Sequence, residues 1–172
     1  MYGGNKMKEK AKHEIQWTVE KYIAKDTQEI VEKEIKPYEV IKAKPHNCLL
    51  HEGIATMLGL LCGIGAETTY SNANARIGVG DLGTAPADTQ TGLLGGAETL
   101  YKGMNATYPS KSGEHDIVFQ SDFITGEAEW AWLEECIDNG AAAAKDLCRQ
   151  NTSLGTKPAG QTWRITGTIT WT

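Results

Sequence analysis

The sequence predicts a mainly β protein, an antiparallel β-sandwich or small barrel with one packed helix at about residues 48–62 and an N-terminal β-hairpin arm. Short runs of alternating apolar and polar residues recur along the chain, which is typical of half-buried strands. Dense groups of Gly, Asn, Asp and Thr separate these runs, as turns do. Only one stretch repeats its apolar residues clearly at helical steps of three and four.

Length and charge predict one ordinary domain preceded by an arm. The chain has 172 residues, 40% of them hydrophobic and 23% charged, and a chain of this size buries a core without disulfides or metals. Residues 1–46 hold ten Lys and eight acids, a net charge of +2, whereas the remainder carries a net of −7. We therefore divide the chain into an arm or hairpin at residues 1–45 and a β-sandwich-like domain at residues 46–172.

Charge and hydropathy also argue against two classes of partner. Neither part of the chain concentrates Lys and Arg as phosphate neutralisation requires, so we expect no nucleic-acid partner. The sequence has no stretch of about 18 uninterrupted apolar residues, and its start lacks the apolar segment of an export signal. We therefore expect no membrane partner and synthesis in a cytoplasm.

The first two predicted elements form the hairpin. Residues 13–22 alternate, with Trp17 and Val19 on the apolar side, which predicts a strand. Residues 29–44 suit either a second strand or a charged helix. We favour the strand, because Pro37 would break a helix interior and β-branched residues are frequent here.

The predicted helix follows at about residues 48–62. Its apolar residues recur at helical steps, which predicts a broad apolar face packed closely against a sheet or a neighbouring subunit. Asn47 is a candidate cap for its start and Gly63 for its end.

The rest of the chain predicts short strands between long loops. Residues 75–79 form one apolar strand within a turn-rich region, and residues 115–123 and 127–137 read as two antiparallel strands. Residues 162–172 alternate most strictly and predict the clearest strand. Residues 139–150 stay open between a helix, favoured by their alanines, and a loop that enters a strand.

Residues 78–83 match the glycine pattern of a dinucleotide-binding turn. That chemistry requires a helix to begin at once, so that its N-terminal amides meet the pyrophosphate. Residues 84–89 have turn composition instead, and no βαβ pattern surrounds them. We interpret these glycines as shaping a loop after a strand, and predict no cofactor.

Two further groups resemble catalytic or metal sites. His46, Cys48 and His51 lie close together, with His115 or Cys136 as a distant fourth ligand, but their spacing matches no known zinc pattern, so we predict no metal site. Residues 134 and 135 are adjacent glutamates, which point to opposite faces of a strand and cannot flank one glycosidic bond.

No catalytic residue is predicted, and the chain is expected not to be an enzyme. The sequence contains no nucleophile-elbow pattern. Its four cysteines show no paired spacing, and we expect them to be reduced, buried small hydrophobes: Cys48, Cys62, Cys136 and Cys148.

The tryptophans are the candidate functional side chains. Aromatic residues supply the largest buried areas in cores and interfaces, and exposed ones also form platforms for sugar rings. We expect a core or subunit-interface role for the five of them: Trp17, Trp130, Trp132, Trp163 and Trp171.

Several segments follow one another in a recognisable order between about residues 46 and 172: NCLLHEGI, SNANARIGVGD, TQTGL, YKGMNATYPS, IVFQSDFITGEAEWAWLEECI and TWRITGTITWT. This order resembles a family of small tailed-bacteriophage virion proteins, and is similar to the N-terminal module of phage tail-collar fibre proteins. Glu135, Cys136 and the segment NGAAAAKDLCRQ depart from the family pattern, which leaves the local register open.

The resemblance implies a virion component, made in the host bacterial cytoplasm, with no catalytic residues. Its expected partners are copies of itself and other virion proteins, the major capsid or tail proteins. A capsid decoration (cement) protein is the first hypothesis, because a fibre usually continues into a shaft and a receptor-binding tip. A tail fibre or tail adaptor protein is the alternative, and a glycan-binding host-recognition module is the alternative of another class.

Overall fold

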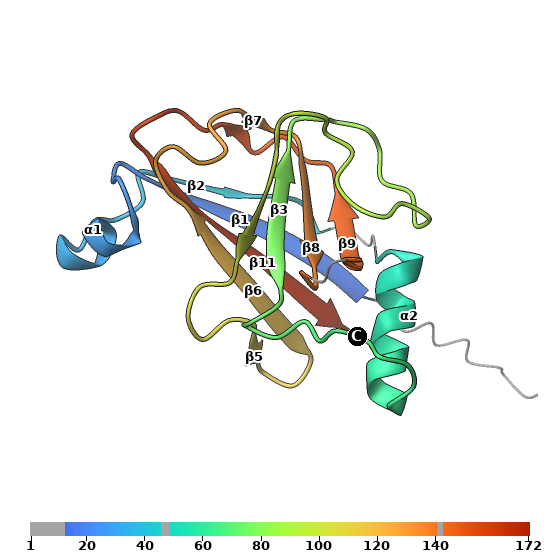
Figure 1. Cartoon of the computed structure of the whole chain (residues 1–172). Helices are drawn as coiled ribbons and strands as arrows, with labels where there is room; N and C mark the ends of the chain where they lie inside the picture. Colours follow the sequence, from blue (N-terminus) through green and yellow to red (C-terminus); the bar gives the residue numbers. More distant parts are fainter. Residues whose placement is uncertain (1–12, 46–48, 141–142) are drawn as a thin grey trace, which may run out of the picture.

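The computed structural model describes residues 13–45, 49–140 and 143–172. The elements in chain order are β1 (His13–Tyr22), α1 (Thr27–Glu32), β2 (Glu39–Lys42), α2 (His51–Cys62), β3 (Arg76–Gly80), β4 (Thr99–Gly103), β5 (Ser110–Ser112), β6 (Asp116–Phe123), β7 (Ala131–Trp132), β8 (Glu134–Asp138), β9 (Asp146–Gln150), β10 (Gly155–Thr156) and β11 (Thr162–Trp171). The fold is mainly β, as predicted, and it forms an open sandwich with no closed barrel (Figure 1). Among the described residues, no helix is long and apolar enough to cross a membrane.

The larger sheet has the strand order β2-β1-β11-β6-β5, and all its pairs are antiparallel. β1 and β11 pair along ten residues each, from His13 opposite Trp171 to Tyr22 opposite Thr162. Side chains on these strands alternate between buried and partly exposed, because successive residues of a strand point to opposite faces. The two strands with the strictest alternation are therefore confirmed.

Residues 29–44 contain both structures that their pattern suggested. α1 occupies the first part, and Asp26 caps it by accepting a hydrogen bond from the Glu29 amide. Pro37 lies between α1 and β2, which pairs with β1 and completes the predicted hairpin. The hairpin shares one core with the rest of the chain, since Trp17 packs in the same buried cluster as Ile77. The predicted boundary at residues 45 and 46 therefore does not divide the hydrophobic core.

The smaller of the two packed sheets has the order β4-β3-β8-β9 and lies face to face with the larger one (Figure 1), and β7 and β10 form a separate two-stranded sheet. Apolar side chains from both sheets fill the space between them, including Ile165 of β11 and Ile137 of β8. The segments predicted at residues 115–123 and 127–137 do form strands, but they are not partners. β6 pairs with β11 and β5, whereas β8 pairs with β3 and β9.

The described part of residues 139–150 is a loop that enters a strand, and that strand, β9, forms the edge of the smaller sheet. Residues 141 and 142, two of the alanines that favoured a helix, lie outside the described residues. From Asp146 on, pairing with β8 determines the local structure, as tertiary contacts commonly do.

The predicted helix is α2, and it ends at Gly63 in the left-handed conformation, as expected. It packs against β9 of a sheet, one of the two predicted alternatives, and Ile54 and Met57 pack against the core. The apolar face is not buried as a whole, since Leu58 and Leu61 are 57% and 82% exposed. The buried residues of the helix are Gly53 and Thr56. A methyl group at Gly53 would lie 2.6 Å from the Leu147 Cα, so glycine lets the helix backbone lie directly on β9.

Candidate functional site

The tryptophans divide between the core and its margin. Trp132 and Trp163 are buried, and their rings meet edge to face with centroids 5.0 Å apart, a favourable arrangement for aromatic pairs. Trp17 is also buried. Trp130 and Trp171 are partly buried and pack against this core. Of the five residues, these two retain solvent-accessible surface.

The glycine pattern at residues 78–83 has a packing explanation. A Cβ at Gly78 would lie 2.7 Å from the Tyr101 ring, and one at Gly80 would lie 2.5 Å from a carboxylate oxygen of Glu134. These two glycines therefore give space to large side chains on neighbouring strands. β3 ends at Gly80 and continues into an irregular loop, residues 81–98, so the helix that a dinucleotide site requires does not begin there.

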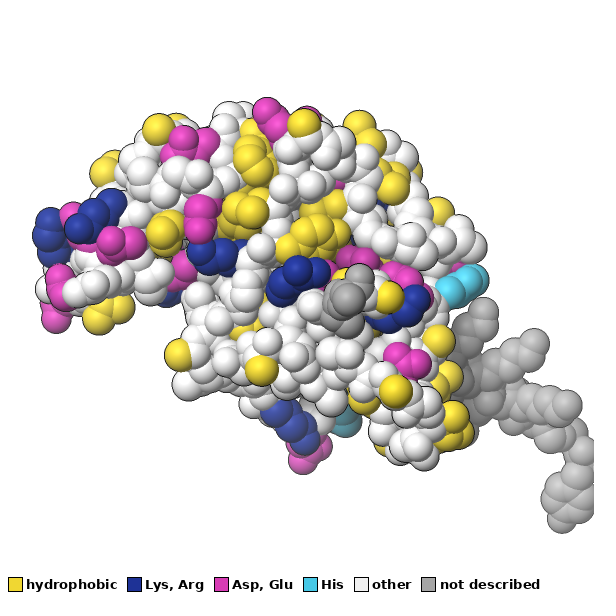
Figure 2. All heavy atoms as spheres, in the orientation of Figure 1, with side chains coloured by type: hydrophobic (Ala, Val, Ile, Leu, Met, Phe, Trp, Pro, Cys, Tyr) yellow, Lys and Arg dark blue, Asp and Glu magenta, His cyan; other side chains and the backbone are white. Residues whose placement is uncertain are grey.

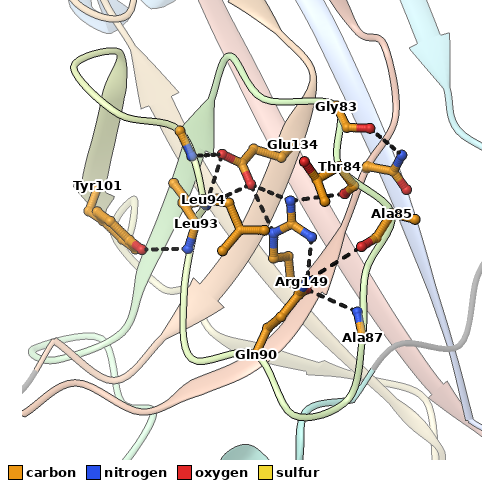
Figure 3. Close-up of polar contacts among 12 residues, drawn as sticks. Gly83, Thr84, Ala85, Ala87, Gln90, Leu93, Leu94, Tyr101, Glu134 and Arg149 are labelled. Atoms are coloured by element: carbon orange, nitrogen blue, oxygen red, sulfur yellow. Dashed lines mark hydrogen bonds and ion pairs between the residues drawn. The ribbon is translucent and has the colours of Figure 1, made fainter.

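Glu134 and Arg149 form an ion pair beneath this loop, and both side chains are fully buried (Figure 3). Glu134 also accepts hydrogen bonds from the backbone amides of Leu94 and Gly95. Arg149 donates to Gln90 Oε1 and to the carbonyl of Thr84. We call this arrangement the loop anchor, because it ties several points of residues 81–98 to β8 and β9.

The loop anchor has little capacity left for chemistry. The carboxylate of Glu134 already accepts hydrogen bonds from a guanidinium and two amides, and it is shielded from solvent. Both side chains are charged groups in the interior, where a charge needs a partner. The geometry supports a structural role in ordering the loop.

Glu135 lies next to Glu134 in the chain but is oriented to the opposite face of the strand, as its position predicts. It is buried, and neither carboxyl oxygen has a hydrogen bond in the structure. Burial raises the pKa of Glu135 well above its ordinary value, although Thr152 and Arg149 act in the other direction. Glu135 thus favours its protonated form, and the two glutamates do not form one catalytic pair.

Two more buried titratable groups lie on the face of β8 and β9 that carries Glu134. Burial raises the pKa of the Cys136 thiol well above its ordinary value and raises the pKa of Asp146 to about 6. A buried thiol of raised pKa is a poor nucleophile. Cys136 and Cys148 are buried as predicted, whereas Cys62 is exposed at the end of α2, so that prediction was wrong for Cys62.

The candidate metal ligands are not brought together where the structure describes them. His46, Cys48 and the candidate cap Asn47 lie outside the described residues. His51 is exposed and contacts Asp88 at 3.3 Å. Within residues 13–45, 49–140 and 143–172, no group of three or more metal-binding side chains gathers at one point.

The best candidate binding site is a pocket of about 580 Å³ between α2, β9, the β5–β6 hairpin and the end of β11. Its apolar wall includes Trp171, Phe119 and Met57. Pockets of this size and character are typical of ligand and peptide sites. The full lining consists of Met57, Tyr70, Pro109, Ser110, Lys111, Glu114, His115, Asp116, Ile117, Phe119, Leu147 and Trp171.

The rim of the pocket is polar and mixed in charge. Glu114 and Asp116 contribute carboxylates, and Lys111 contributes an ammonium group. The His115 ring lies 3.8 Å from Glu114, and both side chains are largely exposed. An apolar interior with a charged margin suits the binding of an amphipathic partner, in which apolar contacts give affinity and charges give orientation.

Exposed apolar side chains of α2 extend this surface. Met57 lines the pocket, and Leu61 lies one helical turn further along the same side of the helix. Leu61 and Ile64 are 82% and 70% exposed, and Figure 2 shows apolar side chains over this end of α2. We call the pocket together with Leu58, Leu61 and Ile64 the pocket face.

Sequence reasoning identified Trp171 but missed the rest of this face. The pocket combines residues from positions 57 to 171 that only the folded sheets bring together. The prediction that the helix packs against a sheet or a neighbouring subunit left open which of its apolar residues stay exposed, because their spacing is the same in either case. No family model, curated protein or solved structure matches this chain.

Proposed function

We propose that this chain is a non-enzymatic structural component of a tailed-phage virion, a capsid decoration protein that binds the particle surface through protein–protein contacts. The observation that supports this most is the pocket face, where Met57 and Trp171 line a pocket and the exposed Leu61 lies one helical turn beyond Met57. Contiguous exposed apolar surface with a polar rim marks interaction sites in proteins of this size. A tail fibre or tail adaptor role fits the same face and is the alternative location.

The loop anchor adds support of a different kind. Buried charge is costly, and here both charges are used to order a loop that has no regular secondary structure. A loop held in one conformation binds a partner without the entropic cost of ordering at that moment. Rigid surfaces of this kind suit a protein whose task is assembly.

The test is the location of the chain on particles. Antibodies raised against the recombinant protein and labelled with gold would be applied to tailed-phage particles purified from the strain that encodes it. We expect regular labelling of the head, together with peptides of this chain in mass spectra of the particles. Labelling confined to the tail would contradict the capsid decoration role and support a tail fibre or tail adaptor protein. Particles with neither label nor peptides would refute the proposal.

A glycan-binding module is the second candidate, favoured by Trp171 beside a pocket with a polar rim. Trp132 cannot serve such a site, because it is fully buried. The candidate predicts that a glycan from a broad panel changes the tryptophan fluorescence of the parent, and that a Trp171→Ala variant loses this change. If no glycan changes the fluorescence of the parent, this candidate fails.

A further inference from the structure

The point where residues 1–12 join the described chain lies beside the pocket face. β1 begins at His13, which pairs directly with Trp171, and Trp171 lines the pocket. Neighbouring strands lie about 5 Å apart. A twelve-residue segment spans up to about 40 Å when extended. His13, where the segment joins β1, and the pocket therefore lie on one side of the molecule. The segment is long enough to reach a pocket on that side.

The composition of residues 1–12 complements the pocket. The segment MYGGNKMKEKAK has four lysines and one glutamate, and its apolar side chains are two methionines, a tyrosine and an alanine. The pocket offers an apolar wall with Glu114 and Asp116 at its margin. Methionine and tyrosine suit irregular apolar sites, and lysines beside carboxylates fix the orientation of the segment. Lys111 at the same rim opposes this attraction in part.

We propose that residues 1–12 of one copy occupy the pocket of a second copy in a symmetric exchange. In a pair related by a two-fold axis at the pocket face, the start of β1 in each copy lies next to the pocket of the other copy. This follows because the start of β1 and the pocket lie on the same side of each molecule. Such a pair also covers Leu58, Leu61 and Ile64, which a segment folded back onto its own pocket would leave exposed to water. This inference rests on the proposed structural role and names the partner as a second copy.

The test uses charge reversal in the full-length chain. One variant carries Lys6→Glu and Lys8→Glu in the segment, and the other carries Glu114→Lys and Asp116→Lys at the rim. Light scattering after gel filtration measures self-association. We expect the parent to form dimers and each variant alone to associate about tenfold or more weakly, with the parent's association weakening as salt rises.

Mixing the two variants identifies which copy provides the segment. In a mixed pair, the acidic segment of the first variant meets the basic rim of the second. The natural segment of the second variant meets the natural rim of the first. The mixture should therefore regain association that neither variant shows alone. A matched control, Glu32→Lys with Glu98→Lys, has the same charge change at exposed sites outside the pocket lining and should associate like the parent.

Three results would overturn the inference: a monomeric parent, variants that associate as well as the parent, or a mixture that does not regain association. The last result, with single variants that are more easily digested within residues 1–12, would place the segment in its own pocket. Each outcome is read in solution without particles. Failure here therefore leaves the location of the chain on the virion to be decided by the gold labelling alone.

Discussion

The loop anchor and the pocket face differ in the polarity of their side chains and in whether those side chains are buried. In the loop anchor, Glu134 and Arg149 are completely buried and bind a loop that has no regular secondary structure. In the pocket face, Leu61 and Trp171 leave apolar surface accessible next to the sandwich. The first region uses polar groups to complete the fold, and the second leaves apolar groups for something outside it. The difference teaches that polarity alone does not identify a functional surface in this chain.

The largest expected effect comes from breaking the loop anchor. Arg149→Met leaves Glu134 buried without its charged partner, so we expect the free energy of unfolding to fall by about 3–5 kcal/mol. Urea denaturation measures this loss, and limited proteolysis should show faster cleavage within residues 81–98. Lys102→Met is the matched control, because its ion pair with Glu127 is partly exposed and should contribute less than about 1 kcal/mol. Equal losses in the two variants would contradict the assigned role.

The next effect concerns how the pocket face is attached to the body. Gly53→Ala places a methyl group 2.6 Å from the Leu147 backbone, which cannot yield easily, so we expect a loss of about 1–3 kcal/mol. A methyl group at Gly59 in the same helix lies 2.8 Å from the flexible Glu67 side chain and 3.0 Å from the Ile64 carbonyl oxygen. These contacts are milder than the one at Gly53, and the gain in helix propensity of Gly59→Ala, about 1 kcal/mol, offsets them in part. Thermal or urea unfolding compares the two. A larger loss of unfolding free energy in Gly59→Ala than in Gly53→Ala would contradict the assigned contact between α2 and β9.

The pH dependence of stability depends on two buried carboxyls, Glu135 and Asp146. Because the folded pKa of Glu135 is raised above 4.5, the unfolded chain releases this proton first, and the free energy of unfolding falls as pH rises above about 4.5. Asp146 contributes with the same sign, but only between 3.8 and about 6. Glu135→Gln should therefore flatten the stability curve above pH 4.5, whereas Asp146→Asn should remove only the part of the slope between 3.8 and about 6. An unchanged slope above pH 4.5 in Glu135→Gln would show that this carboxyl is not the buried acid described here.

The smallest effect on stability is expected at the pocket face itself. Leu61→Lys and Val31→Lys each alter the last turn of a helix at side chains that are 82% and 69% exposed. Both should change the free energy of unfolding by less than about 0.5 kcal/mol. Only Leu61→Lys should weaken self-association in light scattering. A large loss of stability in Leu61→Lys would mean that this residue belongs to the core.

Strand patterns were the most predictable part of the fold. β1 and β11 alternate strictly and lie where their patterns indicated, because each buries one face against the same core. Sheet pairing was harder to predict from the sequence, because the alternation in β6 and β8 does not indicate which sheet each strand joins. In α2, the predicted close packing against a sheet is made at Gly53, on β9. Helical spacing alone did not indicate that Leu58 and Leu61 stay exposed.

The candidate sites were harder to predict than the strands. Glu134 and Arg149 lie 15 residues apart, and only their place inside strands of otherwise buried residues hinted that each needed a partner. The pocket depends on loops and strand ends whose positions follow from the completed sandwich. Sequence periodicity describes the faces of single elements, and it does not describe the spaces that several elements enclose.

Binding to particles assembled without this chain tests the central claim most directly, namely that the protein attaches to the particle through protein–protein contacts that depend on its pocket face, the pairing of two copies through that face included. Purified parent, Leu61→Lys and Val31→Lys would be added to such particles and separated by sedimentation. We predict saturable binding of the parent and of Val31→Lys, with Leu61→Lys about tenfold weaker, the scale of one central interface residue. Absence of saturable binding, or equal binding of all three proteins, would contradict the account.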